Sequence, residues 1–273
     1  MYADLHLHST YSDGTDTPEE LCSLAFKSGV SVISITDHDA VGAYSALAKA
    51  TLPKGLRIIP GVEISTTKNL KMIHILGYHI DIYNKTLESF MERTSIEKTE
   101  STRLNFANAR QKEGFFYDWE RVLELNPGQL RISGIHVIKA MEFDRCGITG
   151  LNLWDFFKKY FLPTSADYIS VETANAYDAV DVIKAASGIP VIAHPVTLED
   201  DDTVTGLLRG GAQGLEVFHP VHSDADTYKY LRIAKREKAF ITGGTDWHGT
   251  NSNRFITHFA MKGLENGDYA ILQ

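Results

Sequence analysis

Ala3-Asp4-Leu5-His6-Leu7-His8, near the start of the chain, alternates apolar and polar residues without a break. Alternation with a period of two predicts a β-strand, which we expect over Tyr2–Leu7. Successive side chains of a strand point to opposite faces, so Asp4, His6 and His8 share one face. The first strand therefore places two imidazoles and a carboxylate side by side.

Strand and helix patterns alternate after this stretch. Thr17-Pro18-Glu19-Glu20 is typical of a helix start, since it combines a capping hydroxyl, a proline in the first turn and acids at the positive end of the helix dipole. The expected elements are a helix at Pro18–Ser28, a strand at Val32–Thr36, a helix at Ala43–Ala50, a strand at Arg57–Val62 and a hairpin-like stretch at Met72–Tyr78. Later come helices at 177–187, 203–210 and 225–236 and strands at 190–193, 214–218 and 240–242. This order predicts an α/β fold with one barrel-like parallel sheet.

The strand pattern stops between these two parts. From residue 86 to about 161 the sequence is helical and charged, and Leu87, Phe90 and Met91 form a candidate inner face. We therefore expect a helical insertion at 86–165. It interrupts a discontinuous barrel domain made of residues 1–85 and 166–273.

Composition narrows the class of protein. The 273 residues are 43% hydrophobic and 23% charged, as in ordinary globular domains. Apolar runs are far shorter than the roughly 20 residues that span a bilayer, and no signal-peptide pattern is present, so we expect a cytoplasmic protein without a membrane partner. Cys22 and Cys146 are too few for a disulfide framework and are expected to be buried, reduced thiols. A net charge of −8 argues against extended nucleic-acid binding, although a cationic pocket could hold a nucleotide.

Nearly every predicted strand ends in a histidine or a carboxylate. The segments are Asp4 to His8, Thr36-Asp37-His38-Asp39, Gly61-Val62-Glu63, His74, Ala193-His194-Pro195, Val217-Phe218-His219 and Asp246-Trp247-His248. In a parallel α/β barrel the carboxyl ends of the strands converge on one mouth, where the active site lies. Seven separate segments are therefore expected to meet at one place.

Each of these residues, taken alone, is more often a hydrogen-bonded core residue than a ligand. The set as a whole favours a metal site, because imidazole and carboxylate ligands suit zinc, manganese and iron. The absence of cysteine ligands argues against a structural zinc knot. The pattern indicates an open, catalytic metal centre.

Six motifs resemble those of the PHP (polymerase and histidinol phosphatase) superfamily: Asp4 to His8, Ser12-Asp13-Gly14, Thr36-Asp37-His38-Asp39, Gly61-Val62-Glu63, Ala193-His194-Pro195 and Asp246-Trp247-His248. The resemblance covers residues 1 to about 83 and about 166 to 250. It implies an α/β fold of the distorted (β/α)7 barrel type with a trinuclear metal site. The ions would be divalent, with manganese, iron or zinc as the expected metals and magnesium as a further option.

Nine ligand positions follow from this resemblance. The first metal would take His6, His8, Glu63 and Asp246. Glu63 would bridge to a second metal completed by His74 and His194. The third metal would take Asp13, His38 and His248.

The resemblance also implies a chemistry. Three divalent ions bring six positive charges and the carboxylates of Asp13, Glu63 and Asp246 remove three, which leaves a surplus that suits an anionic ester. A water between metals would be acidified to a metal-bridging hydroxide and attack phosphorus in line. The expected enzyme is a metal-dependent phosphoesterase, a hydrolase that acts on a phosphomonoester.

Several polar residues stand beside the ligand motifs. His219 could contact the phosphate or act as an acid, and a structural hydrogen bond is the alternative. Asp37, our second catalytic candidate, and Asp4 are expected to orient imidazoles. Asp39 also stands beside a ligand motif and could have the same role, and capping of a turn is the alternative. Tyr11 could stack on a base or simply pack.

The insertion resembles that of stand-alone PHP phosphoesterases similar to 3′,5′-nucleotide bisphosphate phosphatases and 5′-to-3′ exoribonucleases. In their helix-opening motif His136 matches, but Gly134 stands where an arginine is usual. Arg131 or Lys139 could replace that arginine as a phosphate contact. Arg103 is a weaker candidate, and a solvated helix face is the alternative for all three cations.

The leading hypothesis is hydrolysis of a nucleotide 3′,5′-bisphosphate or a short RNA end. The partner would then be a small phosphorylated substrate, and protein partners stay open. A histidinol-phosphate-type phosphatase is the nearest alternative. An amidohydrolase would normally use a metal-bridging lysine, and no lysine lies at a predicted strand end. A non-catalytic PHP binding module would have lost ligands, whereas all nine positions are filled.

Overall fold

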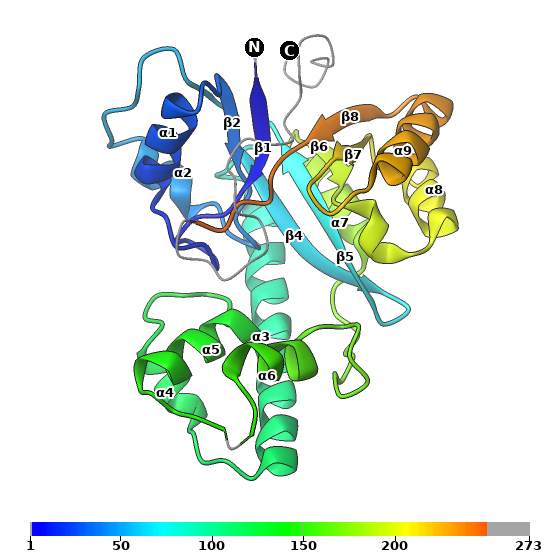
Figure 1. Ribbon diagram of the computed structural model, residues 1–273. Coiled ribbons are helices and arrows are strands. Elements are labelled where there is room, and N and C mark those ends of the chain that lie inside the picture. Colours follow the sequence, from blue (N-terminus) through cyan, green and yellow to red (C-terminus); the bar gives the residue numbers. More distant parts are fainter. Residues whose placement is uncertain (1, 149, 250–273) are drawn as a thin grey trace.

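The computed structural model describes residues 2–148 and 150–249 of the chain. An α/β body contains the strands, and one long helix extends from it into a second group of helices, which lies below the body in Figure 1. The strands are β1 Ala3–Leu7, β2 Val32–Ile35, β3 Arg57–Ile58, β4 Gly61–Lys68, β5 Lys71–Tyr78, β6 Ile189–Ile192, β7 Gly214–Phe218 and β8 Phe240–Gly243. The helices are α1 Pro18–Lys27, α2 Gly42–Leu47, α3 Lys85–Glu113, α4 Trp119–Glu124, α5 Gly134–Phe143, α6 Leu153–Phe161, α7 Ala176–Ala185, α8 Asp201–Arg209 and α9 Asp224–Glu237, with a 3-10 turn η1 at Pro195–Leu198.

The strands form two sheets. One has the order β1-β2-β3 and is parallel, and the other has the order β4-β5-β6-β7-β8. Over the described residues these sheets do not close into a barrel. They touch at two isolated bridges, Leu7 with Trp247 and His38 with Glu63. Both bridges join residues at or beside the candidate ligands, so the seam between the sheets is where the ligand segments meet.

The expected strand at 57–62 is wrong in detail, because the chain changes sheets within it. Arg57 and Ile58 pair with β2, whereas Gly61 begins β4 in the second sheet. Pro60 lies between them and has no N–H to continue a ladder. The change of sheet brings Glu63 under the end of β2.

The sheet is also not uniformly parallel. Strands β4 and β5 form an antiparallel hairpin, as Met72–Tyr78 suggested, and β5 is antiparallel to β6 as well. His74 therefore lies in mid-strand, paired with Ser65, and not at the carboxyl end of a parallel strand. It reaches the cluster because Ser65 and Glu63 lie on the same face of β4.

The body and the lower helices have separate hydrophobic cores. Helix α3 contributes to both: Leu87 and Met91 pack in the body, whereas Phe106 and Ala109 pack with α4, α5 and α6. Helices α3 to α6 occupy most of the expected insertion at 86–165. The domain boundaries remain a prediction, and residues 250–273 of the expected barrel domain lie outside the described residues.

Local sequence patterns explain the ends of several elements. Thr17 caps α1 in a reciprocal capping box with Glu20, as expected from the helix-start motif. Cys22 is buried, but Cys146 is only partly buried, which corrects that expectation; both are free thiols. None of the helices within the described residues is long and apolar enough to cross a membrane.

Candidate metal centre

The structure brings all nine expected ligand positions together at the seam. Strand β1 presents His6 and His8 on one face, where their ring centroids lie 5.2 Å apart. Glu63 of β4 and Asp246, which follows β8, complete a group whose ligand atoms all lie within 4.8 Å of one another. This group is the set expected for the first metal.

Glu63 lies at the middle of the cluster and is buried. Its Oε2 is 3.3 Å from His6 Nε2, 3.2 Å from His8 Nε2 and 3.0 Å from His38 Nδ1. Its Oε1 is 2.9 Å from His74 Nδ1 and 3.1 Å from His194 Nε2. The two oxygens thus face different histidines, which is the geometry that a bridging carboxylate requires.

A third group gathers around Asp13, in the loop after β1. Asp13, His8, His38 and His248 place ligand atoms within 4.8 Å of one another. Asp13 Oδ1 lies 3.2 Å from His248 Nε2. His38 also belongs to a group with Glu63 and His74, so neighbouring groups share members.

The donor atoms of this cluster fit divalent metal ions. His6 Nε2, His8 Nε2, His38 Nδ1 and Glu63 Oε2 are buried and have no hydrogen-bond partner among the described residues. Buried polar atoms of this kind normally have partners, so several converging without one indicate a missing ligand. Imidazole nitrogens and carboxylate oxygens are ligands of zinc, manganese and iron.

The electrostatics of the cluster are strongly coupled. Burial lowers the pKa of His74 to about 4 and that of His38 well below its usual range. Burial would raise the pKa of Glu63, but His38, His74 and His6 hold it well below its usual range. Burial alone would also lower the pKa values of His6 and His8, but the neighbouring carboxylates raise the pKa of His8 to about 9 and that of His6 well above its usual range. At neutral pH the cluster therefore combines neutral and protonated imidazoles with ionised carboxylates, and metal binding would release the protons.

Glu216 was not among the expected residues. Its Oε1 is 2.9 Å from His6 Nδ1, and its Oε2 accepts a hydrogen bond from the backbone N–H of His194 at 2.7 Å. It therefore orients one ligand ring and the backbone of a second ligand. The available signal was an acid in the centre of the apolar stretch Gly214–Phe218, where a carboxylate needs a buried partner.

The expected role of Asp4 and Asp37 is corrected by their contacts. Asp37 accepts hydrogen bonds from Ser9 and Ser12, and Asp4 accepts them from the N–H and hydroxyl of Thr245. Neither makes a described hydrogen bond to an imidazole. Asp37 is completely buried and holds the loop that carries Asp13, and its catalytic role stays a prediction.

His219 lies beside the cluster and lines the adjoining cavity. Its Nδ1 accepts a hydrogen bond from the N–H of Val221 at 3.2 Å, and its Nε2 is 3.7 Å from Asp246 Oδ2. Because Nδ1 is the acceptor, the proton of the neutral ring is on Nε2. The ring is thus arranged as a donor at the edge of the cluster.

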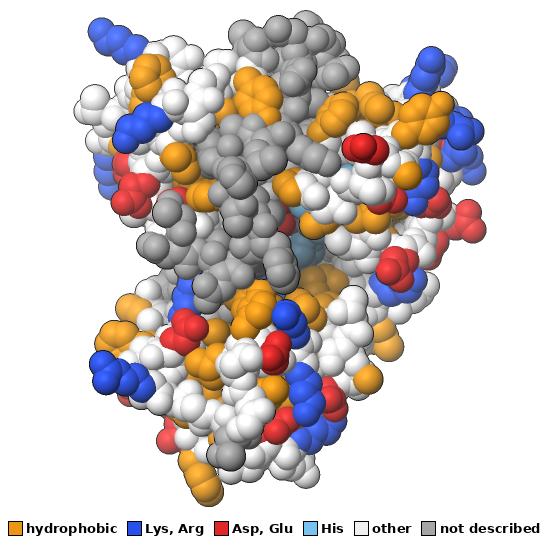
Figure 2. Space-filling model, viewed as in Figure 1, with side chains coloured by type: hydrophobic (Ala, Val, Ile, Leu, Met, Phe, Trp, Pro, Cys, Tyr) orange, Lys and Arg blue, Asp and Glu red, His pale blue; other side chains and the backbone are white. Residues whose placement is uncertain are grey.

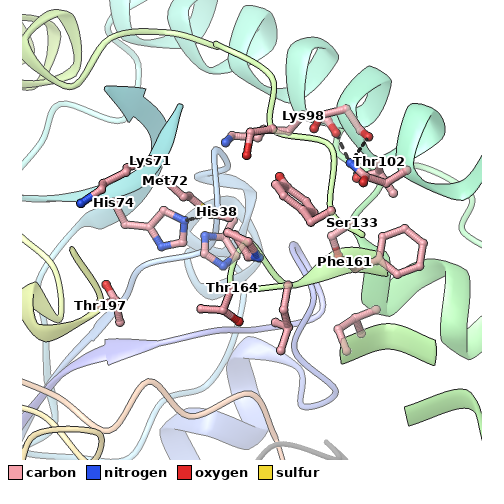
Figure 3. Close-up of a pocket in the computed structure, with 18 of the residues that line it drawn as sticks. His38, Lys71, Met72, His74, Lys98, Thr102, Ser133, Phe161, Thr164 and Thr197 are labelled. Carbon is pink, nitrogen blue, oxygen red and sulfur yellow. Dashed lines mark hydrogen bonds between the residues drawn. The ribbon is translucent and has the colours of Figure 1, made fainter. Parts of the chain in front are cut away.

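A cavity of about 850 Å³ opens from the cluster toward the lower helices. Figure 2 shows histidine at the bottom of the hollow between the body and these helices. In Figure 3, His38 and His74 lie on one side of the cavity, and Lys98, Thr102 and Phe161 lie on the other. Body and insertion therefore share the walls of one pocket.

The expected substrate contacts on the insertion lie at different places. Arg131 lines the cavity. His136 and Lys139 instead contact the backbone of the Asp13 loop: His136 Nε2 is 3.1 Å from Ser12 O, and Lys139 Nζ is 3.2 Å from Asp13 O. Neither side chain is among those that line the cavity.

Two further expectations are not supported by position. The side chain of Arg103 is 57% exposed and pairs with Glu100 at 2.7 Å, away from the cavity wall. The ring of Tyr11 lies against Gly42 and does not line the cavity, so packing is its role in this structure.

Lys98 on α3 is a cavity residue that the sequence patterns missed. It lies on the buried stripe of α3 with Met91, Ser95, Ser101 and Asn105. Their helical spacing was the available signal, because a lysine on the inward face of a helix is unusual.

These features define a class of protein. An α/β body that collects histidines and carboxylates from many strand ends beside a deep cavity has the arrangement of a metal-dependent hydrolase.

Residues 4–160 match the PHP domain family, and the chain belongs to that family. It is 29% identical to a phosphoribosyl 1,2-cyclic phosphate 1,2-diphosphodiesterase of Eggerthella lenta, over 91% of this chain and 95% of that protein. It is 29% identical to a 3′,5′-nucleoside bisphosphate phosphatase of Chromobacterium violaceum, over 90% and 86%. It is 34% identical to the 5′-3′ exoribonuclease Rnm of Salmonella typhimurium, over 90% and 84%.

Solved structures agree with this assignment of the fold. A Bifidobacterium adolescentis protein superposes with a TM-score of 0.80 at 24% identity, covering 97% of this chain and 93% of the other. An amidohydrolase from Chromobacterium violaceum, with sulfate bound and no metal, superposes with a TM-score of 0.79 at 28% identity, covering 94% and 90%. The protein is a PHP-family phosphoesterase of the metal-dependent type.

Proposed function

We propose that this phosphoesterase hydrolyses a phosphomonoester of a nucleotide 3′,5′-bisphosphate or of a short RNA end. The observation that carries the proposal is the cavity, which joins the nine-residue cluster to a wall containing Lys98 and Arg131. Trp154, Phe157 and Tyr168 also line it and offer aromatic surface for a base. A substrate with a reacting phosphate, a second anion and a ring would use all three parts.

The nine positions would hold three divalent ions in the groups described above, with manganese, iron, zinc or magnesium as the metal. We infer that the two sheets, which touch at the two bridges described above, are an open form of the expected (β/α)7 barrel. When bound, such ions supply positive charge for a phosphate and acidify water to the metal-bridging hydroxide that attacks phosphorus. The carboxylates of Asp13, Glu63 and Asp246 leave part of that positive charge uncompensated.

The chain's own residues would bind and orient the ester. His219 Nε2 is placed to donate a hydrogen bond to a phosphate oxygen or, when the ring is an imidazolium, a proton to the leaving oxygen. Arg131 can hold phosphate oxygens through two N–H groups in parallel. The lower helices cover the cavity and keep water away from these contacts.

The relatives support a phosphate substrate, since those named above act on a nucleotide, an RNA or a phosphosugar by their names. Histidinol phosphate carries a single phosphate, so a phosphatase of that type would leave the cations of the cavity wall, Lys98 and Arg131, without an anion. A non-catalytic module would be expected to lack ligands. A cytoplasmic location and a small phosphorylated partner, without extended nucleic-acid binding, belong to the same proposal.

The proposal is tested by assaying metal-reconstituted protein against adenosine 3′,5′-bisphosphate, short 5′-phosphorylated RNA, histidinol phosphate and a simple amide. We expect phosphate release from the first two. The His194→Ala variant should lose at least 100-fold in activity and part of its bound metal, because a ligand of the second ion is gone. His79→Ala, outside the cluster, is the control.

Full metal content with no phosphate released from any ester would contradict the proposal. Preferred cleavage of histidinol phosphate would replace it with the alternative phosphatase.

A further inference from the structure

Two cationic side chains of the cavity wall lie close to one another and are largely buried. Lys98, on α3, is only 8% exposed, and the Arg131 side chain, in the segment before α5, is 13% exposed. Both line the cavity that adjoins the histidine cluster, and Figure 3 shows Lys98 on the wall opposite His38 and His74. The two residues lie on separate segments of the helical insertion, so the fold has to bring these charges together.

The protein offers this pair little compensation. Asp39 is the carboxylate in contact, with its Oδ2 3.5 Å from Arg131 Nη1. The other oxygen of Asp39 already accepts hydrogen bonds from Ser65 N–H and the Thr94 hydroxyl. Asp39 also attracts the ammonium of Lys98 electrostatically, so one buried carboxylate faces two cations.

Several hydrogen-bond donors of these two cations have no partner among the described residues. Arg131 Nε and Nη1 are buried without a hydrogen-bond partner, and the ammonium of Lys98 makes no described hydrogen bond or ion pair. The nearby acids are engaged elsewhere: Glu97 accepts from the N–H of Ala174, and Glu172 from that of Leu70.

Two buried cations that share a single carboxylate are strongly unfavourable, so their presence on a cavity wall calls for an anion. Burial, reinforced by Arg131, lowers the pKa of Lys98 to about 8, which still leaves it charged at pH 7. A guanidinium and an ammonium in one wall match a phosphate, which accepts several charge-assisted hydrogen bonds.

We propose that Lys98 and Arg131 form a second anion subsite, separate from the metal cluster, which holds the phosphate that is not cleaved. The inference rests on the proposed function and narrows it to substrates with two phosphoryl groups separated by a sugar-sized spacer. It assigns Lys98 as a specificity-determining residue. The enzyme then distinguishes bisphosphates from monophosphates by this subsite.

The first test needs no metal and no turnover. Binding of inorganic phosphate to the EDTA-treated protein is measured by calorimetry at pH 7, where the cluster carries no ions that could attract the probe. Lys98→Met and Arg131→Met should each weaken binding by about 10- to 100-fold, the range for one charge-assisted contact. Lys71→Met is the matched control, because Lys71 also lines the cavity but donates to Leu198 O.

The second test uses the metal-loaded enzyme. The ratio of kcat/KM for adenosine 3′,5′-bisphosphate to that for adenosine 5′-monophosphate should fall at least tenfold in Lys98→Met, mainly through KM. Lys98→Arg should restore most of the ratio, and Lys71→Met should keep it. Circular dichroism of each variant checks the fold, and Lys98→Met carries the test if Arg131→Met does not fold.

The subsite is overturned if metal-free protein does not bind phosphate, if both variants bind it as the parent does, or if the ratio is unchanged. These outcomes are distinct from a failure of the proposed function. If the enzyme cleaves none of the esters but binds phosphate through Lys98, the proposed function is contradicted and the anion subsite is retained.

Discussion

Glu63 shows how one residue organises the cluster. Each of its two oxygens faces a different set of histidines, at 2.9 to 3.3 Å. A carboxylate in a fully buried position needs such partners to remain ionised. Histidines brought this close to it gain a shared ligand, so the carboxylate and the imidazoles define the site jointly.

Glu216 holds His6 from behind, so its removal should weaken metal binding without removing a ligand. We expect Glu216→Gln to lower the affinity for Zn²⁺ by about 10- to 100-fold, the usual effect of losing a group that orients a ligand. Competition with a chelator measures this affinity. Glu113→Gln is the control, since Glu113 pairs with Lys159 and Tyr160 in the insertion. An affinity within twofold of the parent would rule out the orienting role.

The buried ammonium of Lys98 should lower the free energy of unfolding by an amount that depends on pH. Its pKa falls from 10.5 to about 8, chiefly by burial, and at about 1.4 kcal/mol per unit this is a penalty of roughly 3 kcal/mol. Below pH 8 the folded and unfolded chains are both protonated, and the full penalty applies. Between pH 8 and 10.5 the unfolded chain binds more protons, so this contribution to stability rises with pH. The charged groups that face Lys98 are Arg131, Asp39, Glu97 and Glu172.

We therefore expect Lys98→Met to raise the free energy of unfolding at pH 7 by up to about 3 kcal/mol. The gain should shrink as the pH approaches 10. Urea denaturation at pH 7 and pH 9.5 checks both statements, with Lys71→Met as the control. A gain that does not change with pH would mean that methionine packing, and not charge burial, is responsible.

Residue types and their spacing could predict the proposed ligands, but not the residues that orient those ligands. His6, His8 and Asp246 stand in short motifs whose spacing is visible in the chain. Glu216 is a single acid in an apolar strand, and its partner His6 lies 210 positions away. Such pairings depend on strand order and register, which local patterns do not contain.

At the scale of elements, the β4–β5 hairpin carries His74 and reaches the cavity. Its turn has Asn69 and Leu70 at positive φ, 53° and 64°. Leucine is unfavourable there because its Cβ approaches the following carbonyl oxygen. Leu70 is 52% exposed and lines the cavity, so this strain accompanies a functional position.

Leu70→Gly should relieve the strain. We expect the free energy of unfolding to rise by about 0.5 to 1 kcal/mol, since the left-handed penalty of about 1 to 2 kcal/mol exceeds the entropy that glycine loses. Thermal and urea unfolding measure the change. Leu70→Ala, which keeps the Cβ, should give no gain, and an equal gain from both would trace the effect to the side chain.

Gly134 opens α5 under the ring of Phe161. A Cβ at this position would lie 2.5 Å from Phe161 Cγ and 2.6 Å from its Cβ. We expect Gly134→Ala to lower the free energy of unfolding by about 1 to 3 kcal/mol, the usual effect of overpacking. At Gly147 an added Cβ meets no atom within 4 Å, so Gly147→Ala is the control. Equal stabilities of the two variants would contradict the contact.

Sequence periodicity located most strands and helices of the body but not their arrangement. The single expected strand at 57–62 failed at Pro60, where the chain leaves one sheet for the other. The antiparallel direction of β5 also escaped prediction, because alternation is the same in both directions. Ligand convergence was predicted from a parallel barrel, and it is achieved here by a hairpin as well.

At the scale of the whole molecule, the insertion and the body meet at the loop that carries Asp13. His136 contacts Ser12 O, Lys139 donates to Asp13 O, and Gln129 Nε2 donates to Thr10 O at 2.9 Å. The insertion therefore does more than cover the cavity. It holds the loop that carries Asp13, a proposed ligand of the third metal.

The His136 contact offers a way to test this coupling from the insertion side. The imidazole bridges the two parts: its Nδ1 accepts from Ser133 N–H at 3.0 Å, and its Nε2 donates to Ser12 O. His136→Phe fills a similar volume but leaves both backbone groups without this partner, at a cost of about 1 to 3 kcal/mol. We expect a lower Tm, about tenfold weaker binding of one metal ion per chain and a lower kcat, because Asp13 is less firmly held. Metal titration with elemental analysis gives the stoichiometry.

Arg121→Met is the control for damage confined to the insertion, because Arg121 pairs with Asp144 and Glu124 within the lower helices. It should lower Tm without changing the number of metals bound. If His136→Phe also binds metal as the parent does while losing stability, the insertion and the cluster are independent. If only His136→Phe loses the one ion, a contact on the insertion controls a ligand on the body, as expected of a site that both parts build.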